Sequence, residues 1–188
     1  MVLEEHSLFR FQETVNLEIR PELDFETIRG QAGVPAFVRR GIIGGFTLPV
    51  YADNNQELFF TIHIPRRWDG KSDITVHVDG YLDTANNAKK FRFQLEWENL
   101  TPGTDVVPAT NNPLIVETTT GNWAQFQSFS IEFIVVYDID GGDALVLPAD
   151  DIFIRFYRLA ATIDEIAGNP VVTHVGVRFN REILGPPI

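Results

Sequence analysis

Three aspartates around a pair of glycines are the first residues whose spacing suggests chemistry. The segment YDIDGGDAL, residues 137–145, contains Asp138, Asp140 and Asp143. Carboxylate oxygens on a loop are ligands that Ca²⁺ prefers, and only Asp150 and Asp151 lie near enough in sequence to complete the shell. The spacing departs from the EF-hand pattern. A charged hairpin tip with glycines at positive φ explains the same residues, and we prefer it to a calcium site.

Two histidines suggest a second metal site. His63 and His77 are predicted on the polar faces of strands that are consecutive in sequence, so the two imidazoles could lie side by side. Together with Asp79 they would offer three zinc ligands. His6 and His174 are too distant along the chain to be assigned to this group. No fixed fourth ligand is evident, and exposed cross-strand histidines are the preferred interpretation.

The segment IPRRWDG, residues 64–70, allows two interpretations. Pro65 ends a strand, Asp69 and Gly70 form a turn, and Trp68 is large enough to cap an open end of a β-sheet core. Alternatively, Trp68 and the exposed side of Tyr81 would stack on a sugar ring as a ligand-binding platform. We prefer the structural interpretation.

No enzyme motif is present in the sequence. There is no G-x-S-x-G elbow, P-loop or dinucleotide fingerprint, and Glu96 and Glu98 are a carboxylate pair on the wet face of one predicted strand. The chain has no cysteine, which excludes disulfides and thiolate chemistry. We therefore expect a protein that is not an enzyme, with no catalytic residue and no cofactor.

The charge of the chain argues against two classes of partner. The formal net charge is −11 and the pI is about 4.7, so the protein repels phosphate backbones and anionic membranes. Basic residues occur as isolated pairs in different segments. Glu4 and Glu5 lie where a signal peptide would carry positive charge, and no run of eighteen apolar residues occurs. We expect neither nucleic-acid nor membrane binding, and no export by a signal peptide.

The elements that must position these residues are strands. The segment KKFRFQLEWEN, residues 89–99, alternates apolar and polar side chains, which predicts a half-buried strand. Similar patterns, separated by turn residues, predict eight main strands in all. They lie within residues 46–51, 57–65, 72–82, 89–99, 113–119, 124–136, 151–160 and 171–180.

Two details of side-chain orientation follow from the same alternation. Phe126 breaks the alternation of the strand that follows it, which predicts a bulge or bend near residues 127–128. In the last strand, Val171, Thr173, Val175 and Val177 are predicted to share one face. The whole pattern predicts an all-β protein, an antiparallel β-sandwich of jelly-roll type over residues 41–188, with an immunoglobulin-like sandwich as the alternative.

Residues 1–40 have no sustained period and contain Pro21 and Pro35. We interpret them as an extended N-terminal arm, with a short strand within residues 7–19. Apolar residues of an arm that cannot pack on their own domain often pack on a neighbouring subunit. The candidates for oligomer or capsid contacts, in the arm and the apolar tail, are Phe9, Phe11, Leu17, Ile19, Phe25, Ile183 and Leu184.

Three short motifs follow one another between residues 41 and 180. They are F-x-x-x-x-P-x-x-W-D, F-x-L-x-W and R-x-x-R-x-A. Their residues are Phe60, Pro65, Trp68, Asp69, Phe93, Leu95, Trp97, Arg155, Arg158 and Ala160. In this order they resemble small virion structural proteins of tailed phages and environmental viral genomes.

The resemblance implies a jelly-roll decoration or auxiliary capsid protein that stabilises the viral head through symmetric contacts. It implies capsid proteins of the same virion as partners, a homotrimer, a place on the capsid exterior, and the host cytoplasm during assembly. Two alternatives remain open: a single-jelly-roll capsid protein, and a carbohydrate-binding or receptor-binding module of a phage tail or fibre.

Overall fold

The protein folds as a β-sandwich in a computed structural model, which describes residues 10–17, 35–51, 56–64, 68, 72–100, 112–135, 146–147 and 150–182. Twelve strands and no helix occur in these ranges. Accordingly, no helix in the described part of the chain could span a membrane. The prediction of an all-β protein with antiparallel sheets is confirmed.

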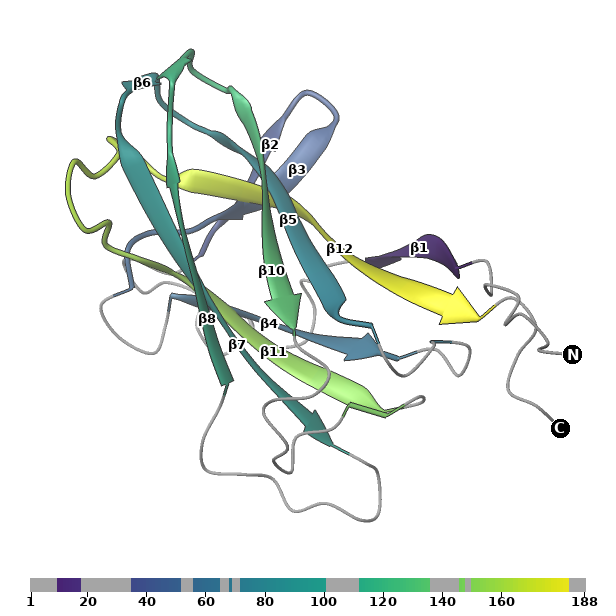
Figure 1. The fold of residues 1–188 in the computed structure, drawn as a ribbon. Coiled ribbons are helices and arrows are strands. Elements are labelled where there is room, and N and C mark those ends of the chain that lie inside the picture. Colours follow the sequence, from purple (N-terminus) through teal and green to yellow (C-terminus); the bar gives the residue numbers. More distant parts are fainter. Residues whose placement is uncertain are drawn as a thin grey trace, which may run out of the picture.

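One layer of the sandwich is a six-stranded antiparallel sheet (Figure 1). Its order is β10-β5-β12-β3-β2, and β1 also pairs with the long strand β12. Its strands are β1 (Arg10–Leu17), β2 (Phe37–Arg40), β3 (Ile43–Thr47), β5 (Ile74–Leu82), β10 (Ser128–Val135) and β12 (Pro170–Glu182).

The other layer is a four-stranded antiparallel sheet with the order β4-β11-β7-β8. Its strands are β4 (Glu57–His63), β7 (Lys90–Leu100), β8 (Asn112–Thr119) and β11 (Asp151–Leu159). The short strands β6 (Asn86–Asn87) and β9 (Asn122–Trp123) form a separate ribbon. Each of the eight predicted main strands overlaps a strand of the two sheets, although the one expected at 46–51 lies earlier, as β3, because Pro49 cannot donate to a ladder.

The core lies between the two sheets and is rich in phenylalanine. The inward faces of β7 and β10 follow the predicted alternation, with every second side chain buried. The ring of Phe156 in β11 stacks on that of Phe93 within its own sheet, with ring centroids 5.0 Å apart. It also meets the ring of Phe133 in the opposite sheet edge-on, with centroids 5.9 Å apart. Such aromatic pairs add to the hydrophobic burial that holds the layers together.

The predicted face of the last strand is wrong over part of its length. The pairing of β12 with β5 shifts between Val172 and His174, so Thr173 forms a β-bulge. Val172, not Thr173, therefore joins the core together with Val175 and Val177. A bulge adds one residue to one strand and reverses the alternation on one side of it.

The predicted bend before β10 is confirmed. Gln125 and Phe126 form a turn, and Phe126 has a φ of 67°, in the left-handed region that non-glycine residues rarely adopt. Its backbone N–H donates to the carbonyl of Leu82 at 2.8 Å. Phe126 therefore lies outside the alternation of side chains, which begins at Ser128.

Part of the segment that we interpret as an arm belongs to the six-stranded sheet. Strand β1 pairs with β12 from Arg10 opposite Glu182 to Leu17 opposite Val175, and β2 pairs with β3. Phe11 and Leu17 thus lie in β1. The remaining predicted contact residues, Phe9, Ile19, Phe25, Ile183 and Leu184, lie outside the described residues.

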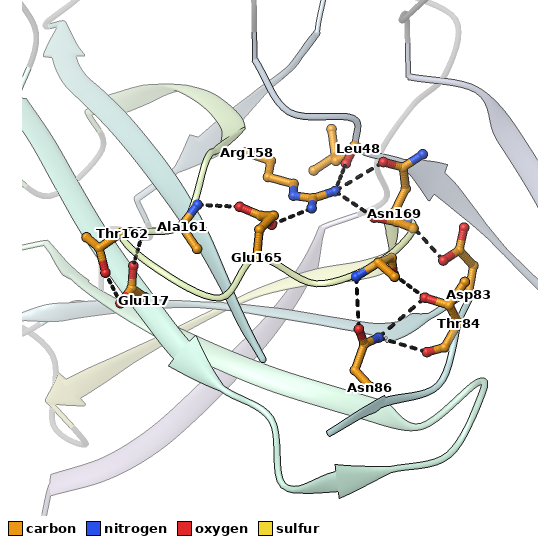
Figure 2. Close-up of polar contacts among 12 residues, drawn as sticks. Leu48, Asp83, Thr84, Asn86, Glu117, Arg158, Ala161, Thr162, Glu165 and Asn169 are labelled. Carbon is orange, nitrogen blue, oxygen red and sulfur yellow. Dashed lines mark hydrogen bonds and ion pairs between the residues drawn. The ribbon is translucent and has the colours of Figure 1, made fainter. Parts of the chain in front are cut away.

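A buried arginine organises one end of the sandwich (Figure 2). Arg158 of β11 is 1% exposed and donates to the carbonyls of Leu48 and Gly168 and to the Asn169 side chain, at 3.1 to 3.3 Å. Its second terminal nitrogen is 2.5 Å from the Glu165 carboxylate, which also accepts a hydrogen bond from the Ala161 N–H. The motif R-x-x-R-x-A therefore contains a structural arginine.

Candidate functional site

The outer face of the six-stranded sheet, turned away from the core, carries most of the candidate site residues. On β5, alternation turns His77, Asp79 and Tyr81 to this face, opposite to the core residues Val76 and Val78. On β12, the residues after the bulge that face the same way are His174, Gly176 and Arg178. The two strands are hydrogen-bonded neighbours, so their outward side chains meet.

A pocket of about 520 Å³ opens on this face. Its volume is within the range of small-molecule sites. Its walls come from β2, β3, β5, β10, β12 and the turn before β10. The lining residues are Arg40, Ile43, Asp79, Gly80, Tyr81, Phe126, Ser128, Phe129, Ser130 and Thr173.

Aromatic and charged groups are combined in the pocket. The rings of Tyr81 and Phe126 meet edge to face, with centroids 6.0 Å apart. The guanidinium carbon of Arg40 lies 3.0 Å from the Phe126 ring centroid, a cation–π contact between the β2–β3 hairpin and the turn. The hydroxyls of Ser128 and Ser130 and the Asp79 carboxylate add polar groups. The pocket can therefore offer apolar contact together with hydrogen bonds, the combination that a sugar requires.

Next to the pocket, two imidazoles and a carboxylate converge. His77 is paired with Gly176 across the β5–β12 ladder, and Asp79 is paired with His174. One ligand atom from each of His77, Asp79 and His174 lies within 4.8 Å of the other two. The two imidazole centroids are 5.6 Å apart. Burial lowers the pKa of His77 from its usual value, and the negative charge of Asp79 opposes this shift.

The predicted histidine pair is wrong, because β4 and β5 belong to different sheets. His63 lies on β4, where its Nδ1 atom is 2.8 Å from a carboxylate oxygen of Asp151. It cannot approach His77 on the opposite layer of the sandwich. The structure replaces it with His174, which the distance along the chain had led us to leave out.

Trp68 does not form a sugar-binding platform. It is 3% exposed and belongs to the core, and its indole N–H donates to the Ser72 hydroxyl at 3.2 Å. The preferred structural interpretation of Trp68 agrees with this burial. Tyr81 is also largely buried, but it lines the pocket described above.

Of the candidate calcium ligands, the structure describes only Asp150 and Asp151. Asp138, Asp140 and Asp143 lie outside the described residues. Asp150 is 3% exposed and accepts a hydrogen bond from the Leu147 N–H, and Asp151 pairs with His63. Both of these carboxylates thus have partners within the protein.

The outer face of the four-stranded sheet carries a different polar cluster. Arg155 of β11 contacts the carboxylates of Glu57 at 2.7 Å and Glu96 at 3.3 Å, and it donates to the Tyr51 hydroxyl at 2.9 Å. The Tyr157 hydroxyl donates to Glu96 at 2.6 Å. Burial and this hydrogen bond to Glu96 raise the pKa of Tyr157 above its usual value. Glu96 is therefore engaged in a closed network rather than paired with Glu98 as a catalytic dyad.

Sequence reasoning missed His174, Arg40 and Phe126 as site residues. The sequence carried one signal for His174. In each of the segments 77–79 (H-V-D) and 174–176 (H-V-G), the first and third residues must lie on the same face of their strand. No local signal indicates that these two strands are adjacent. Arg40 was assigned to the arm, and its contact with Phe126 depends on long-range packing.

No family model and no curated protein matches this sequence. Among solved structures, part of tripeptidyl peptidase 2 is similar, with 11% identity and a TM-score of 0.37 over 76% of this chain. Part of the dimeric latent PorU from Porphyromonas gingivalis is similar over 93% of this chain, with 5% identity and a TM-score of 0.38. The chain spans 10% and 13% of those two chains. Similarities this weak say nothing about function.

Proposed function

We propose that this chain is a non-enzymatic virion structural protein, a decoration or auxiliary protein of the capsid. It would stabilise the shell through repeated contacts between identical subunits and with capsid proteins. The single observation that carries the proposal is a projecting hairpin with three exposed large apolar side chains. The resemblance of its motifs to virion proteins of tailed phages supports the same conclusion.

The hairpin joins β2 to β3 through a turn at Gly41 and Ile42 and projects from the six-stranded sheet (Figure 1). Ile42 at its tip is 94% exposed, and Ile43 next to it is 53% exposed. Phe37, which is paired with Phe46 at the other end of the hairpin, is 60% exposed. Large apolar side chains gathered at one projecting edge favour burial against a partner. We assign this edge to contacts with a second copy of the chain, in a homotrimer.

The strand order supports a jelly-roll topology. The eight main strands can be renumbered 1 to 8 along the chain, in the order β3, β4, β5, β7, β8, β10, β11 and β12. In this numbering, one layer has the strand order 6-3-8-1 and the other has the order 2-7-4-5. Two interlocked Greek keys of a jelly roll produce this alternation between layers. Jelly rolls occur both in viral capsid domains and in lectin domains. The topology therefore agrees with a virion role and equally with carbohydrate binding.

The charge supports a position on the capsid exterior. A net charge of −11 keeps free subunits soluble in the host cytoplasm during assembly and disfavours contact with packaged DNA. Weak contacts of one subunit become strong when symmetry repeats them around the shell.

The experiment is a measurement of mass by light scattering on the full chain and on a hairpin variant with Phe37→Ser and Ile42→Ser. We expect a trimer for the natural sequence and a folded monomer for the variant, because the two substitutions remove exposed apolar surface. The Phe37 ring also meets the core residue Phe46 edge-on, with centroids 5.5 Å apart, so circular dichroism must first establish that the variant is folded. Phe59→Ser is the control, since Phe59 is 53% exposed, close to the 60% of Phe37, but lies on the outer face of the four-stranded sheet. A monomeric natural chain, or a variant that stays trimeric, would contradict the proposal. Deleting residues 1–40 is a poorer test, since it removes β1 and β2 from the sheet.

A second candidate function is carbohydrate or receptor binding, as in a module of a phage tail or fibre. The pocket at Tyr81 and Phe126 favours it, because two aromatic rings stand beside Arg40, Asp79 and two serines. A glycan array would test it. Binding that is lost in Tyr81→Ala and kept in Phe59→Ala would support this function, and the absence of any bound glycan would contradict it.

A further inference from the structure

The cluster of His77, Asp79 and His174 differs from the other polar clusters of the protein because its side chains lack partners. Within the described residues, no hydrogen bond or ion pair involves either imidazole or the Asp79 carboxylate. His77 is 7% exposed, and its Nδ1 atom is buried without a hydrogen-bond partner. The other buried side-chain nitrogens without a partner in that part of the chain are guanidinium Nε atoms. Leaving a buried imidazole nitrogen unpaired has a cost in stability, and the Nε2 atom of the same ring has no hydrogen bond to any residue that the structure describes either.

The ladder positions the three ligating side chains on one face. Asp79 and His174 are directly opposite one another, and His77 is two residues before Asp79 on the same strand. Residues opposite one another in an antiparallel pair have Cβ atoms about 5 Å apart, a separation at which their side chains can share one ion. The rigid sheet thus brings two nitrogen ligands and one oxygen ligand together.

Gly176 provides the space that the two imidazoles occupy. A Cβ atom at this position would collide with Cε1 and Nε2 of His77 and would come within 3.0 Å of Nε2 of His174. Both Nε2 atoms therefore gather over the α-carbon of Gly176. Any other residue at this position would separate them.

The surrounding charges include both signs. Glu132 of β10 is paired with His77 across the β10–β5 ladder, and it forms an ion pair with Arg178 of β12 at 3.0 Å. This ion pair joins the two strands that flank β5, so it lies beside His77. With Arg178 neutralised by Glu132, the Asp79 carboxylate supplies the net negative charge of the cluster.

We propose that His77, Asp79 and His174 form a binding site for Zn²⁺ or a similar divalent transition metal. Two imidazoles and one carboxylate are a common ligand set for this ion, and the fourth position would be taken by water. Tetrahedral zinc places its ligand atoms about 3.3 Å apart, given bond lengths near 2.0 Å. The half-buried His174 and Asp79 side chains reach this spacing by rotation about their own bonds, while the buried His77 stays in place. The site is independent of the proposed virion role and shares Asp79 with the pocket wall.

The test is a titration of the metal-free full chain with Zn²⁺ by calorimetry, together with the visible absorption of Co²⁺ bound in place of zinc. We expect one equivalent to bind the natural chain, with a spectrum typical of tetrahedral Co²⁺. His174→Gln and Asp79→Asn are expected to weaken binding by at least about 100-fold, since even outer-sphere partners contribute 10- to 100-fold.

His63→Gln is the matched control. It removes a histidine that also has a carboxylate beside it, but on the other sheet, and it should leave zinc binding unchanged. Circular dichroism of each metal-free variant establishes that its fold is intact. The proposal is overturned if the natural chain takes up no zinc, or if folded His174→Gln and Asp79→Asn bind it as tightly as the natural chain does.

Discussion

The two sheets of the sandwich carry polar clusters of opposite character on their outer faces. On the four-stranded sheet, Arg155, Glu57, Glu96 and Tyr157 bind one another through hydrogen bonds and ion pairs, and among these four described residues only Nε of Arg155 is buried without a partner. On the six-stranded sheet, the imidazoles and the carboxylate of the metal cluster converge without any such bond among the described residues. Both clusters are partly buried, so burial does not distinguish them. They differ in whether their side chains have hydrogen-bond or ion-pair partners.

This difference is a guide to function. A buried polar network that is complete contributes to the fold and has little capacity left for a ligand. A group of ligating atoms that point at one another without bonding is costly unless something binds between them. We therefore interpret Arg155 and Arg158 as structural residues and the His77 cluster as the candidate binding site.

The largest effect is expected for Arg158→Met. This substitution leaves Glu165 and several carbonyls without their buried donor, and it should lower the free energy of unfolding by about 3–5 kcal/mol. Denaturant unfolding measures the change. Arg178→Met, which breaks the more exposed pair with Glu132, is the control and should cost less than about 1 kcal/mol. Equal effects of the two substitutions would show that the buried network has no special weight.

Arg155→Met tests the hydrogen-bonded network on the four-stranded sheet. It leaves the buried Glu57 carboxylate without its cationic partner, so we expect a loss of about 1–3 kcal/mol in the same unfolding experiment. Glu57→Gln in the Arg155→Met background should recover part of that loss, because the unpaired charge is then absent. A neutral result for Arg155→Met would remove the contrast between the two faces.

His77→Leu makes the corresponding change on the six-stranded sheet. Because the imidazole has no partner in the metal-free protein, an apolar side chain of similar size should change the free energy of unfolding by less than about 1 kcal/mol. The measurement is made with chelator present. A loss as large as that of Arg155→Met would mean that His77 has a structural partner, and the comparison would fail.

The smallest effect concerns pH and an exposed part of the four-stranded sheet. Hydrogen bonds from the Thr162 backbone and side chain, and from Lys90, lower the pKa of Glu117 to about 2. A lowered pKa means that the stabilisation is present above the usual carboxyl range and is lost as pH falls from about 4.5 toward 2. Glu117→Gln should therefore lower Tm slightly at pH 6 and have no effect near pH 2. A carboxyl resonance of Glu117 that titrates near pH 4.5 would contradict this assignment.

Local pattern was a reliable guide to the strands and a poor guide to the site. The alternation in β7, and the inward direction of Arg158 at the end of β11, were predictable because side chains alternate along any extended backbone. The bulge at Thr173 was not, since one inserted residue leaves no mark in the composition of a valine-rich strand. The sequence around Trp68 was compatible with a buried and with an exposed indole ring, and only the packing of the core around it shows that the ring is buried.

The sequence alone determined that this chain forms strands, which side of most strands is apolar, and that the protein is acidic and free of cysteine. Those properties depend on the side chains themselves and on a period of two residues. Only the tertiary structure decided that β4 and β5 lie in different sheets, and that Asp79 meets His174 across 95 residues of chain, about the length of a small domain. Strand pairing is set by how the whole core closes, so no segment carries that information by itself.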